Sequence, residues 1–262
     1  MRGRVSWPAL LGGVAALLWL ALAWGVEIAA LGSRSLGAYL FRHQDIPALL
    51  LGGGALALLG LFVGRARAGR WEWAGRARVI LPLIAGFALT AWAGRHVVFD
   101  DYALSRDEQV AEFAAAAMRH GGLGWPIPPE WIAWRRAIMP EFFSPFGADH
   151  VWMAAYLPLN AAFRALWGWM GDPDLAAPAF LLIGLVALWR VALRLFPERP
   201  DAVAVTMLMA LSSTQLLVTG MTPYAMTGHF ALNMLWLALV LRGGVLGHGG
   251  AALVVLALTG LH

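Results

Sequence analysis

Long apolar runs separated by short arginine-bearing connections dominate the chain. A run of about twenty apolar residues is long enough to cross a hydrocarbon core of about 30 Å. The sequence therefore predicts an all-α protein, a polytopic transmembrane helix bundle of about six to eight membrane segments. One candidate segment, Val151–Met170, is interrupted by Pro158, Asn160 and Arg164. The clear candidates are Pro8–Ile28, Ile46–Gly64, Val79–Val98, Ala176–Phe196, Ala202–Thr219 and Thr227–Leu241.

The distribution of arginine predicts the orientation of these segments, because cytoplasmic connections are enriched in Arg and Lys. Arg2 and Arg4 place the N-terminus in the cytoplasm, and a cluster of five arginines within 65–78 places the second connection there. Residues 79–98 then run outward. The polar stretch 99–150 is therefore expected to form an extracytoplasmic loop.

The composition agrees with a protein of the lipid bilayer. Hydrophobic residues make up 60% and charged residues 13% of the chain, whereas soluble domains carry about 25% charged residues. The basic residues are all arginine. They flank the apolar runs and form no groove with interleaved aromatics, so nucleic acid is not an expected partner. The absence of cysteine excludes disulfides and thiolate sites.

We expect the chain to have two parts. Residues 1–78 hold two N-terminal membrane helices and the arginine-rich cytoplasmic loop, and residues 79–262 hold a second membrane module with the loop 99–150. The last apolar run, from Ala251 to His262, is too short to cross a bilayer. This ending predicts that the natural chain continues with further helices.

The outer loop contains a helix start signal. Ser105-Arg106-Asp107-Glu108 is a capping-box pattern, in which Ser105 is the N-cap and Glu108 reaches back to its amide. The expected helix ends at Gly121-Gly122. Its apolar face consists of Val110, Phe113, Ala114 and Ala117. The loop is therefore expected to carry a surface helix.

The acids around this helix start have two interpretations, which the residues alone leave open. In the structural one, Glu108 only completes the cap, Asp107 only complements the helix dipole, and Asp100 and Asp101 mark the water boundary of the preceding helix. In the functional one, the carboxylates carry out chemistry at that boundary. Asp100 and Asp101, with Asp107 or Glu108, would then also supply the oxygen ligands that Mg²⁺ or Mn²⁺ prefers.

The segment from Ser105 to Pro126 resembles the first extracytoplasmic loop of the GT-C glycosyltransferases. These polytopic enzymes use lipid-phosphate sugars and include bacterial relatives of protein mannosyltransferases and aminoarabinose transferases. The matching residues are Asp107-Glu108, Ala111-Glu112, Gly121-Gly122-Leu123 and Pro126. The resemblance implies that Asp107 is the catalytic acid and that Glu108 is its neighbour in the site.

The next stretch, Tyr156-Leu-Pro-Leu159, is similar to the start of the family's following helix. The resemblance therefore implies that Val151–Met170 spans the membrane. That span would place Arg190 and Arg194 on the outer side, against the arginine rule.

The resemblance further implies a membrane glycosyltransferase of the bacterial inner (plasma) membrane. It would move a sugar from a polyprenyl-phosphate donor to an extracytoplasmic acceptor of unknown identity. A carboxylate is suited to accept the acceptor's proton, and bidentate arginine is suited to the leaving phosphate. One of Arg106, Arg135 and Arg136 would serve that phosphate. Tyr224 and His229, at a break between apolar runs, would line the cavity, although loop structure is the simpler explanation for both.

Two other functions fit a polytopic membrane protein: a transporter or flippase subunit, and a non-catalytic scaffold whose loop binds a partner. A transporter is expected to carry charge within its helices. Here the acids are scarce within the apolar runs and gather in one outer loop, and no inverted repeat is visible. The transferase interpretation is therefore favoured.

Overall fold

A computed structural model describes residues 68–143 and 150–261, together with scattered residues between positions 14 and 54. The chain divides into two compact units, Met1–Arg70 and Trp71–His262. The expected spans Pro8–Ile28 and Ile46–Gly64 belong to the first unit, of which the structure describes only those scattered residues.

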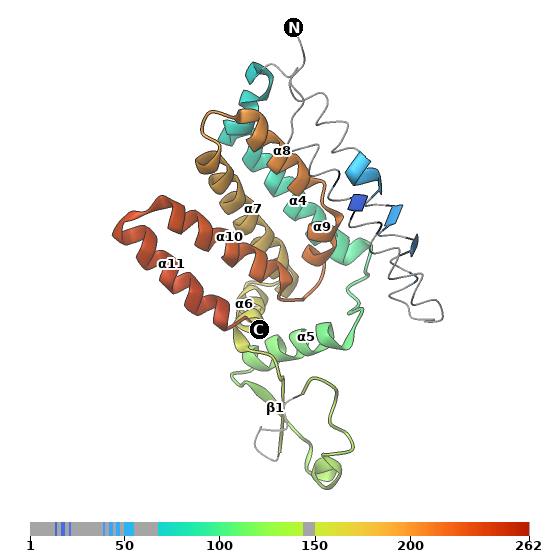
Figure 1. Ribbon diagram of the computed structural model, residues 1–262. Helices are drawn as coiled ribbons and strands as arrows, with labels where there is room; N and C mark the ends of the chain where they lie inside the picture. Colours follow the sequence, from blue (N-terminus) through green and yellow to red (C-terminus); the bar gives the residue numbers. More distant parts are fainter. Residues whose placement is uncertain are drawn as a thin grey trace. The chain divides into compact units, whose positions relative to one another are not determined.

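The second unit is built almost entirely of helices (Figure 1), as the sequence predicts. Its only strands in the described segments are two short ones, which pair antiparallel. After the 3₁₀ helix η3 (Ala68–Gly75), the elements are α4 (Ala77–Val97), α5 (Arg106–Arg119), β1 (Gly124–Pro126), η4 (Pro129–Trp134), β2 (Val151–Met153), α6 (Pro158–Trp169), η5 (Pro173–Leu175), α7 (Ala176–Leu195), α8 (Pro200–Leu211), α9 (Thr214–Gly220), α10 (Met226–Arg242) and α11 (Gly244–Thr259).

Helices α4 and α7 form an antiparallel pair at the centre of this unit. The indole of Trp189, near the end of α7, donates to the carbonyl of Ala74, which precedes α4, at 2.8 Å. The indole of Trp92, near the end of α4, donates to the carboxylate of Asp172, which precedes α7, at 2.7 Å. The end of each helix therefore meets the start of the other. Both helices are long and apolar enough to cross a membrane.

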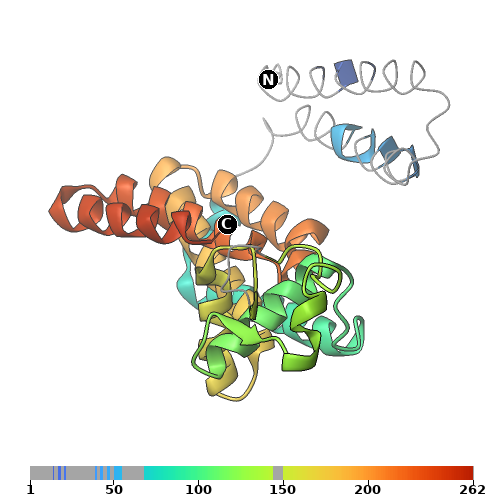
Figure 2. The same ribbon diagram turned by 90° about the horizontal axis from the view of Figure 1, so that it is seen from below.

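Helices α8 and α9 return along this pair as one segment bent by 50°. Helix α10 then runs parallel to α7. Gly184 of α7 lies against Phe230 of α10, and further along both helices Arg194 of α7 donates to the Ala238 carbonyl of α10. Helix α11 turns back along α10, and the two form a hairpin that projects to one side of the unit (Figure 2). The carbonyl of Gly260, after α11, accepts a hydrogen bond from the amide of Leu159 in α6 at 2.9 Å.

The segment expected to span at Val151–Met170 does not do so. Its first residues form β2, and Pro158 then opens α6, which has only 12 residues. Proline is favoured at the first position of a helix and cannot extend one toward the N-terminus. At 1.5 Å per residue, α6 is too short for a hydrocarbon core of about 30 Å. The predicted topology is therefore wrong at this point.

The expected count of six to eight membrane segments is not reached among the described residues. Two helices are long and apolar enough to cross, or three if α8 and α9 act as one bent span. The expected span Ala202–Thr219 is this bent pair. Helix α10 matches the expected run Thr227–Leu241 but has 17 residues, and α11, which contains most of the last run, has 16.

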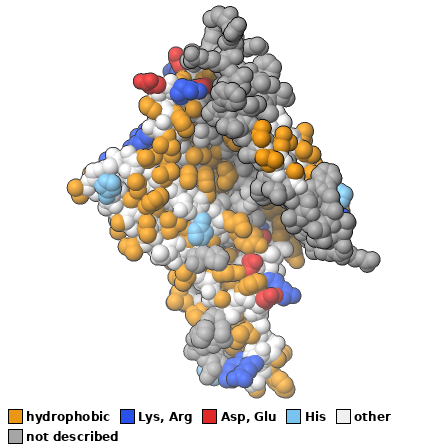
Figure 3. Space-filling view, in the orientation of Figure 1, with side chains coloured by type: hydrophobic (Ala, Val, Ile, Leu, Met, Phe, Trp, Pro, Cys, Tyr) orange, Lys and Arg blue, Asp and Glu red, His pale blue; other side chains and the backbone are white. Residues whose placement is uncertain are grey.

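The surface of the α10–α11 hairpin is strongly apolar. In Figure 3 hydrophobic side chains cover much of the region occupied by these helices. The most exposed large hydrophobic residues of α11 are Val245, Leu246, Leu253 and Leu256. An apolar surface of this kind is suited to contact with lipid. It agrees with a membrane location for the unit.

The interior combines large aliphatic side chains with glycines. The fully buried side chains where α4, α7 and α8 meet include Ile80, Ile84, Leu185 and Met207. Small residues let membrane helices approach closely. Gly184 is such a position, because a Cβ there would lie 2.5 Å from the ring of Phe230 and 3.0 Å from the Cα of Ala231.

Replacement of this glycine tests the close approach of α7 to α10. We expect Gly184→Ala to lower the stability of the protein by about 1–3 kcal/mol, the usual cost of overpacking. Thermal unfolding in detergent measures the change. Gly86→Ala is the matched control, since a Cβ at Gly86 meets nothing within 4 Å and alanine is the better helix former. Equal melting temperatures for the two variants would contradict the packing.

Candidate functional site

The predicted capping box is present at the start of α5. Ser105 is the N-cap, and its Oγ accepts the amide of Glu108 at 3.3 Å. The Glu108 carboxylate accepts the amide of Leu104 at 3.2 Å, one residue before the amide expected from the motif. The helix ends at Arg119, and Gly121 follows with a φ of +86°. Local sequence therefore sets where α5 begins and ends.

The two acids of the first turn point to different environments. Consecutive residues on an α-helix project about 100° apart. Asp107 consequently faces a pocket, whereas Glu108 is only 1% exposed and lies in the protein interior. The sequence grouped both as catalytic, but the structure brings only Asp107 to the pocket.

The pocket has a volume of about 200 Å³ and lies beside the first turns of α5. Its walls come from α5, from the residues around the start of α6, from the first turn of α10 and from the residue Leu261 after α11. Its polar lining residues are Asp107, Tyr156, Asn160, Tyr224 and His229, and the rest of the described lining is apolar. Asp107 is the one carboxylate in that lining. Mostly apolar walls with a few convergent polar groups are typical of small-molecule sites.

Hydrogen bonds connect the polar groups of this pocket to the surrounding helices. The Tyr156 hydroxyl donates to Oδ1 of Asp107. The hydroxyls of Ser105 and Tyr224 lie 2.5 Å apart. The Asn160 amide donates to the carbonyl of Pro223 at 2.9 Å. Asp107 is therefore held within a pocket wall built from distant parts of the chain.

Tyr156 is a neutral donor under physiological conditions. Burial, followed by the hydrogen bond to Asp107, raises the pKa of Tyr156 to about 12. Its phenol therefore keeps its proton and directs it at Oδ1 of Asp107. The second carboxylate oxygen remains available for another partner.

A network of polar side chains joins α5 to its neighbouring helices. It is centred on Arg95, near the end of α4. The Arg95 guanidinium donates to the carbonyls of Asp101 and Tyr102, each at 2.9 Å, and to the Glu112 carboxylate at 2.5 Å. It also lies 3.6 Å from the carboxylate of Asp174. Arg95 is 3% exposed. One buried cation thus connects α4, the α4–α5 connection, α5 and η5.

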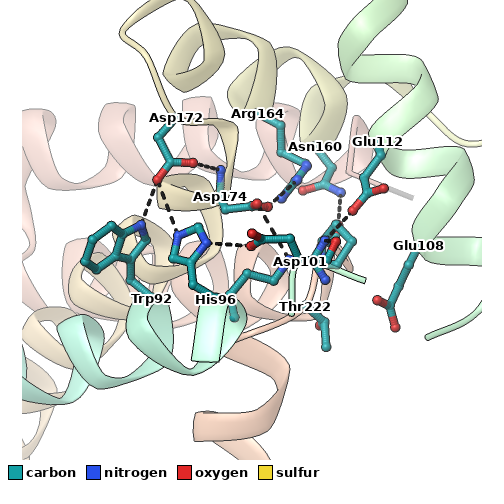
Figure 4. A network of polar contacts seen from close by, with 12 residues as sticks. Trp92, His96, Asp101, Glu108, Glu112, Asn160, Arg164, Asp172, Asp174 and Thr222 are labelled. Atoms are coloured by element: carbon teal, nitrogen blue, oxygen red, sulfur yellow. Dashed lines mark hydrogen bonds and ion pairs between the residues drawn. The ribbon is translucent and has the colours of Figure 1, made fainter. Parts of the chain in front are cut away.

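The same network continues toward α6 and α7 (Figure 4). Arg164 of α6, also 3% exposed, donates to Asp174 at 2.8 Å. On the other side, His96 Nδ1 lies 2.5 Å from Asp101, and His96 Nε2 lies 3.8 Å from Asp172. These contacts tie the end of α4 and the start of α7 to the helices α5 and α6.

Burial sets the ionisation of the two glutamates of α5. Desolvation is the largest effect on both, and it raises the pKa of Glu108 and of Glu112 above the ordinary value. The nearby charges of Arg95 and Arg164 oppose this effect. Neither carboxyl lines the described pocket: Glu108 accepts the Leu104 amide and Glu112 pairs with Arg95, so both glutamates hold α5 in place.

The arginines proposed for the leaving phosphate lie outside the described pocket lining. Arg106 is exposed and pairs with Glu141. Arg135 and Arg136 follow η4 and line a separate surface depression with their chain neighbours. Tyr224 and His229, by contrast, line the pocket as expected.

Asp100 and Asp101 form the turn between α4 and α5. Both have positive φ, 50° and 58°, a conformation that Asp tolerates better than most residues. Asp100 is exposed, and Asp101 is engaged by His96. Within residues 68–143 and 150–261, no group of three His, Asp or Glu side chains is placed to hold a metal ion. The Mg²⁺ or Mn²⁺ site stays a prediction.

Sequence reasoning missed the residues that position Asp107. In the sequence, only the similarity to a helix start singles out Tyr156, and no local pattern assigns a role in the site to Arg95 or Asp174. A usable signal was present in Arg95 and Arg164, because a charge inside an apolar run is costly and marks an ion pair or a site. Comparisons with protein families, with curated proteins and with solved structures found no match to this chain.

Removal of the central cation tests the network. Arg95→Ala leaves the carbonyls of Asp101 and Tyr102 without their guanidinium donor and the half-buried Glu112 without its ion-pair partner. We therefore expect a loss of about 1–3 kcal/mol of stability, the usual cost of leaving buried polar groups unsatisfied. Arg76→Ala is the control, because the Arg76–Glu72 pair is exposed, and exposed pairs contribute about 0–1 kcal/mol. Thermal unfolding in detergent compares them. A similar small loss in both variants would contradict the central role of Arg95.

The pH dependence of stability tests the burial of Glu108. Because its folded-state pKa is raised, the folded protein retains a proton that the unfolded chain has released, and stability falls as pH rises between the ordinary and the raised pKa. Glu108→Gln is neutral at every pH, so its stability should fall less from pH 4.5 to pH 7. Denaturation across that interval measures the slope. The exposed control Glu130→Gln should keep the wild-type slope, and an unchanged slope in Glu108→Gln would oppose this account.

Proposed function

We propose that this chain is an integral membrane glycosyltransferase of the GT-C type. It transfers a sugar from a polyprenyl-phosphate donor to an extracytoplasmic acceptor, and Asp107 is its general base. The observation that carries this proposal is the position of Asp107 as the one carboxylate in the described pocket lining, in the first turn of the helix whose sequence resembles the family's catalytic loop.

The arrangement of arginines supports an extracytoplasmic location of the pocket in the bacterial inner membrane. Because α4 and α7 are antiparallel, the arginines near the start of α4 lie at the same end of the pair as those near the end of α7. These residues are Arg76, Arg78, Arg190, Arg194 and Arg199. The arginine rule places that end in the cytoplasm. Without a span at Val151–Met170, the rule no longer conflicts with the order of the helices.

The proposed reaction is a single displacement at the sugar. The acceptor hydroxyl gives its proton to the Asp107 carboxylate, its oxygen forms a bond to the anomeric carbon, and the bond from that carbon to the phosphate oxygen breaks with its electron pair. Polyprenyl phosphate leaves, and Asp107 later releases its proton to water. Tyr156 holds Oδ1, which leaves Oδ2 to accept the proton.

The first turn of α10 is the best-placed part of the pocket for the leaving phosphate. Met226 and His229 line the pocket there, and Tyr224 lines it just before the helix begins. The N-terminus of a helix carries partial positive charge and unpaired amides. Arg106, Arg135 and Arg136 are placed less well, since none of them lines the pocket. A divalent ion at Asp100 and Asp101 is a separate prediction, and the reaction above does not use it.

Loss of the carboxylate charge at Asp107 tests this function. Asp107→Asn keeps the size of the side chain and accepts the Tyr156 hydrogen bond, but it removes the base, so we expect donor turnover to fall by about 10²-fold or more. The full-length chain in nanodiscs, supplied with a panel of synthetic polyprenyl-phosphate hexoses and pentoses, provides the assay. Glu130→Gln changes an exposed carboxylate outside the pocket lining, so it controls for expression and folding.

Near-normal turnover in Asp107→Asn would remove the general base from this position. Absence of turnover in the wild-type protein with every donor would favour the transporter, flippase or scaffold functions instead.

A further inference from the structure

A second cavity lies on α5 directly beside the first. It is a groove of about 570 Å³ between α5 and residues 139–143. This volume falls within the range of about 300–1,000 Å³ that is usual for sites of small molecules, whereas the Asp107 pocket is smaller. The described lining of the groove includes Arg106, Gln109, Phe113, Met139, Glu141 and Phe143.

The groove adjoins the proposed reaction centre through two contacts. Val110 of α5 lines both the groove and the Asp107 pocket. The ring of Phe142 stacks on Tyr156 with centroids 6.0 Å apart, and Tyr156 donates to Asp107. A ligand in the groove therefore lies next to the wall that holds the base.

The backbone around Phe142 is held in an unusual conformation. Phe142 has a φ of +65°, which is rare for a bulky residue. Its carbonyl accepts the amide of Ala155 at 2.9 Å, and Phe143 forms a β-bridge with Ala154. Such a conformation persists only where surrounding contacts enforce it. These contacts fix the outer wall of the groove against the segment that carries Tyr156.

The chemistry of the groove favours a neutral ligand with many hydroxyls. Among the described lining residues, the one guanidinium, of Arg106, is paired with the one carboxylate, of Glu141, so these residues carry no net charge to attract phosphate. This pair and the Gln109 amide offer several hydrogen-bond donors and acceptors. The rings of Phe113 and Phe143, with centroids 4.7 Å apart, offer apolar surface. A sugar ring presents both kinds of surface, hydroxyls at its edge and C–H groups on its faces.

We propose that this groove binds the acceptor of the transfer and that the acceptor is a neutral saccharide. The acceptor role rests on the proposed function, whereas saccharide binding is measurable without it. The bound saccharide lies along α5 and presents one hydroxyl past Val110 to Asp107.

Filling the groove tests the proposal. Gln109 is exposed on α5, and Gln109→Trp places a large ring in the groove; Ala116→Trp adds the same ring to an exposed position of α5 outside both cavities. Ligand-observed NMR with the full-length chain in nanodiscs measures binding of neutral trisaccharides of glucose, galactose, mannose and N-acetylglucosamine. We expect binding to weaken at least tenfold in Gln109→Trp and to stay unchanged in Ala116→Trp. Thermal unfolding confirms that both variants are folded.

Kinetics separates the acceptor role from binding alone. A transferase without acceptor can pass its sugar to water. We therefore expect Gln109→Trp to lose transfer to the trisaccharide by a larger factor than donor hydrolysis, whereas Ala116→Trp, outside both cavities, should keep both activities. Equal saccharide binding in Gln109→Trp and wild type would overturn the proposal. So would the absence of trisaccharide binding in wild type, or binding of a serine- and threonine-containing octapeptide in place of the trisaccharides. Saccharide binding at the groove without any donor turnover would instead contradict the proposed function.

Discussion

The half of this unit that carries α5 and α6 depends on the contacts of the buried Arg95 guanidinium. A charge so far from solvent is stable only when its partners surround it. Arg95 meets this condition by collecting two backbone carbonyls and two carboxylates from segments that share no regular backbone pairing with α4. The helix that carries Asp107 therefore takes its position from an electrostatic requirement near the end of a membrane-length helix.

The acids around α5 divide into two groups by environment. Glu108, Glu112 and Asp174 face the cations of the interior, where they hold helices together. Asp107 faces the pocket, where its hydrogen-bond partner is a neutral phenol. A base needs a free lone pair and no permanent cation on its oxygens. Asp107, the proposed base, thus differs from the structural acids because its side chain points into the pocket.

Features encoded by adjacent residues were predictable from the sequence, and features that require distant residues were not. The start of α5 follows from Ser105 and Glu108, which are three positions apart and interact locally. The membrane span predicted at Val151–Met170 is wrong for a physical reason. Average hydropathy contains no information on the pairing of Val151 with Pro126 or on the short helix that begins at Pro158. The bond between Tyr156 and Asp107 joins residues that no local pattern relates.

The placement of the pocket also determines when it can form. Its walls combine α5 with the first turn of α10 and with Leu261, which follows α11. Chains are synthesised from the N-terminus, and domains fold as their parts emerge. Asp107 and Tyr156 are therefore made long before the residues that enclose them. The pocket beside Asp107 therefore takes its full shape only after the α10–α11 hairpin has docked.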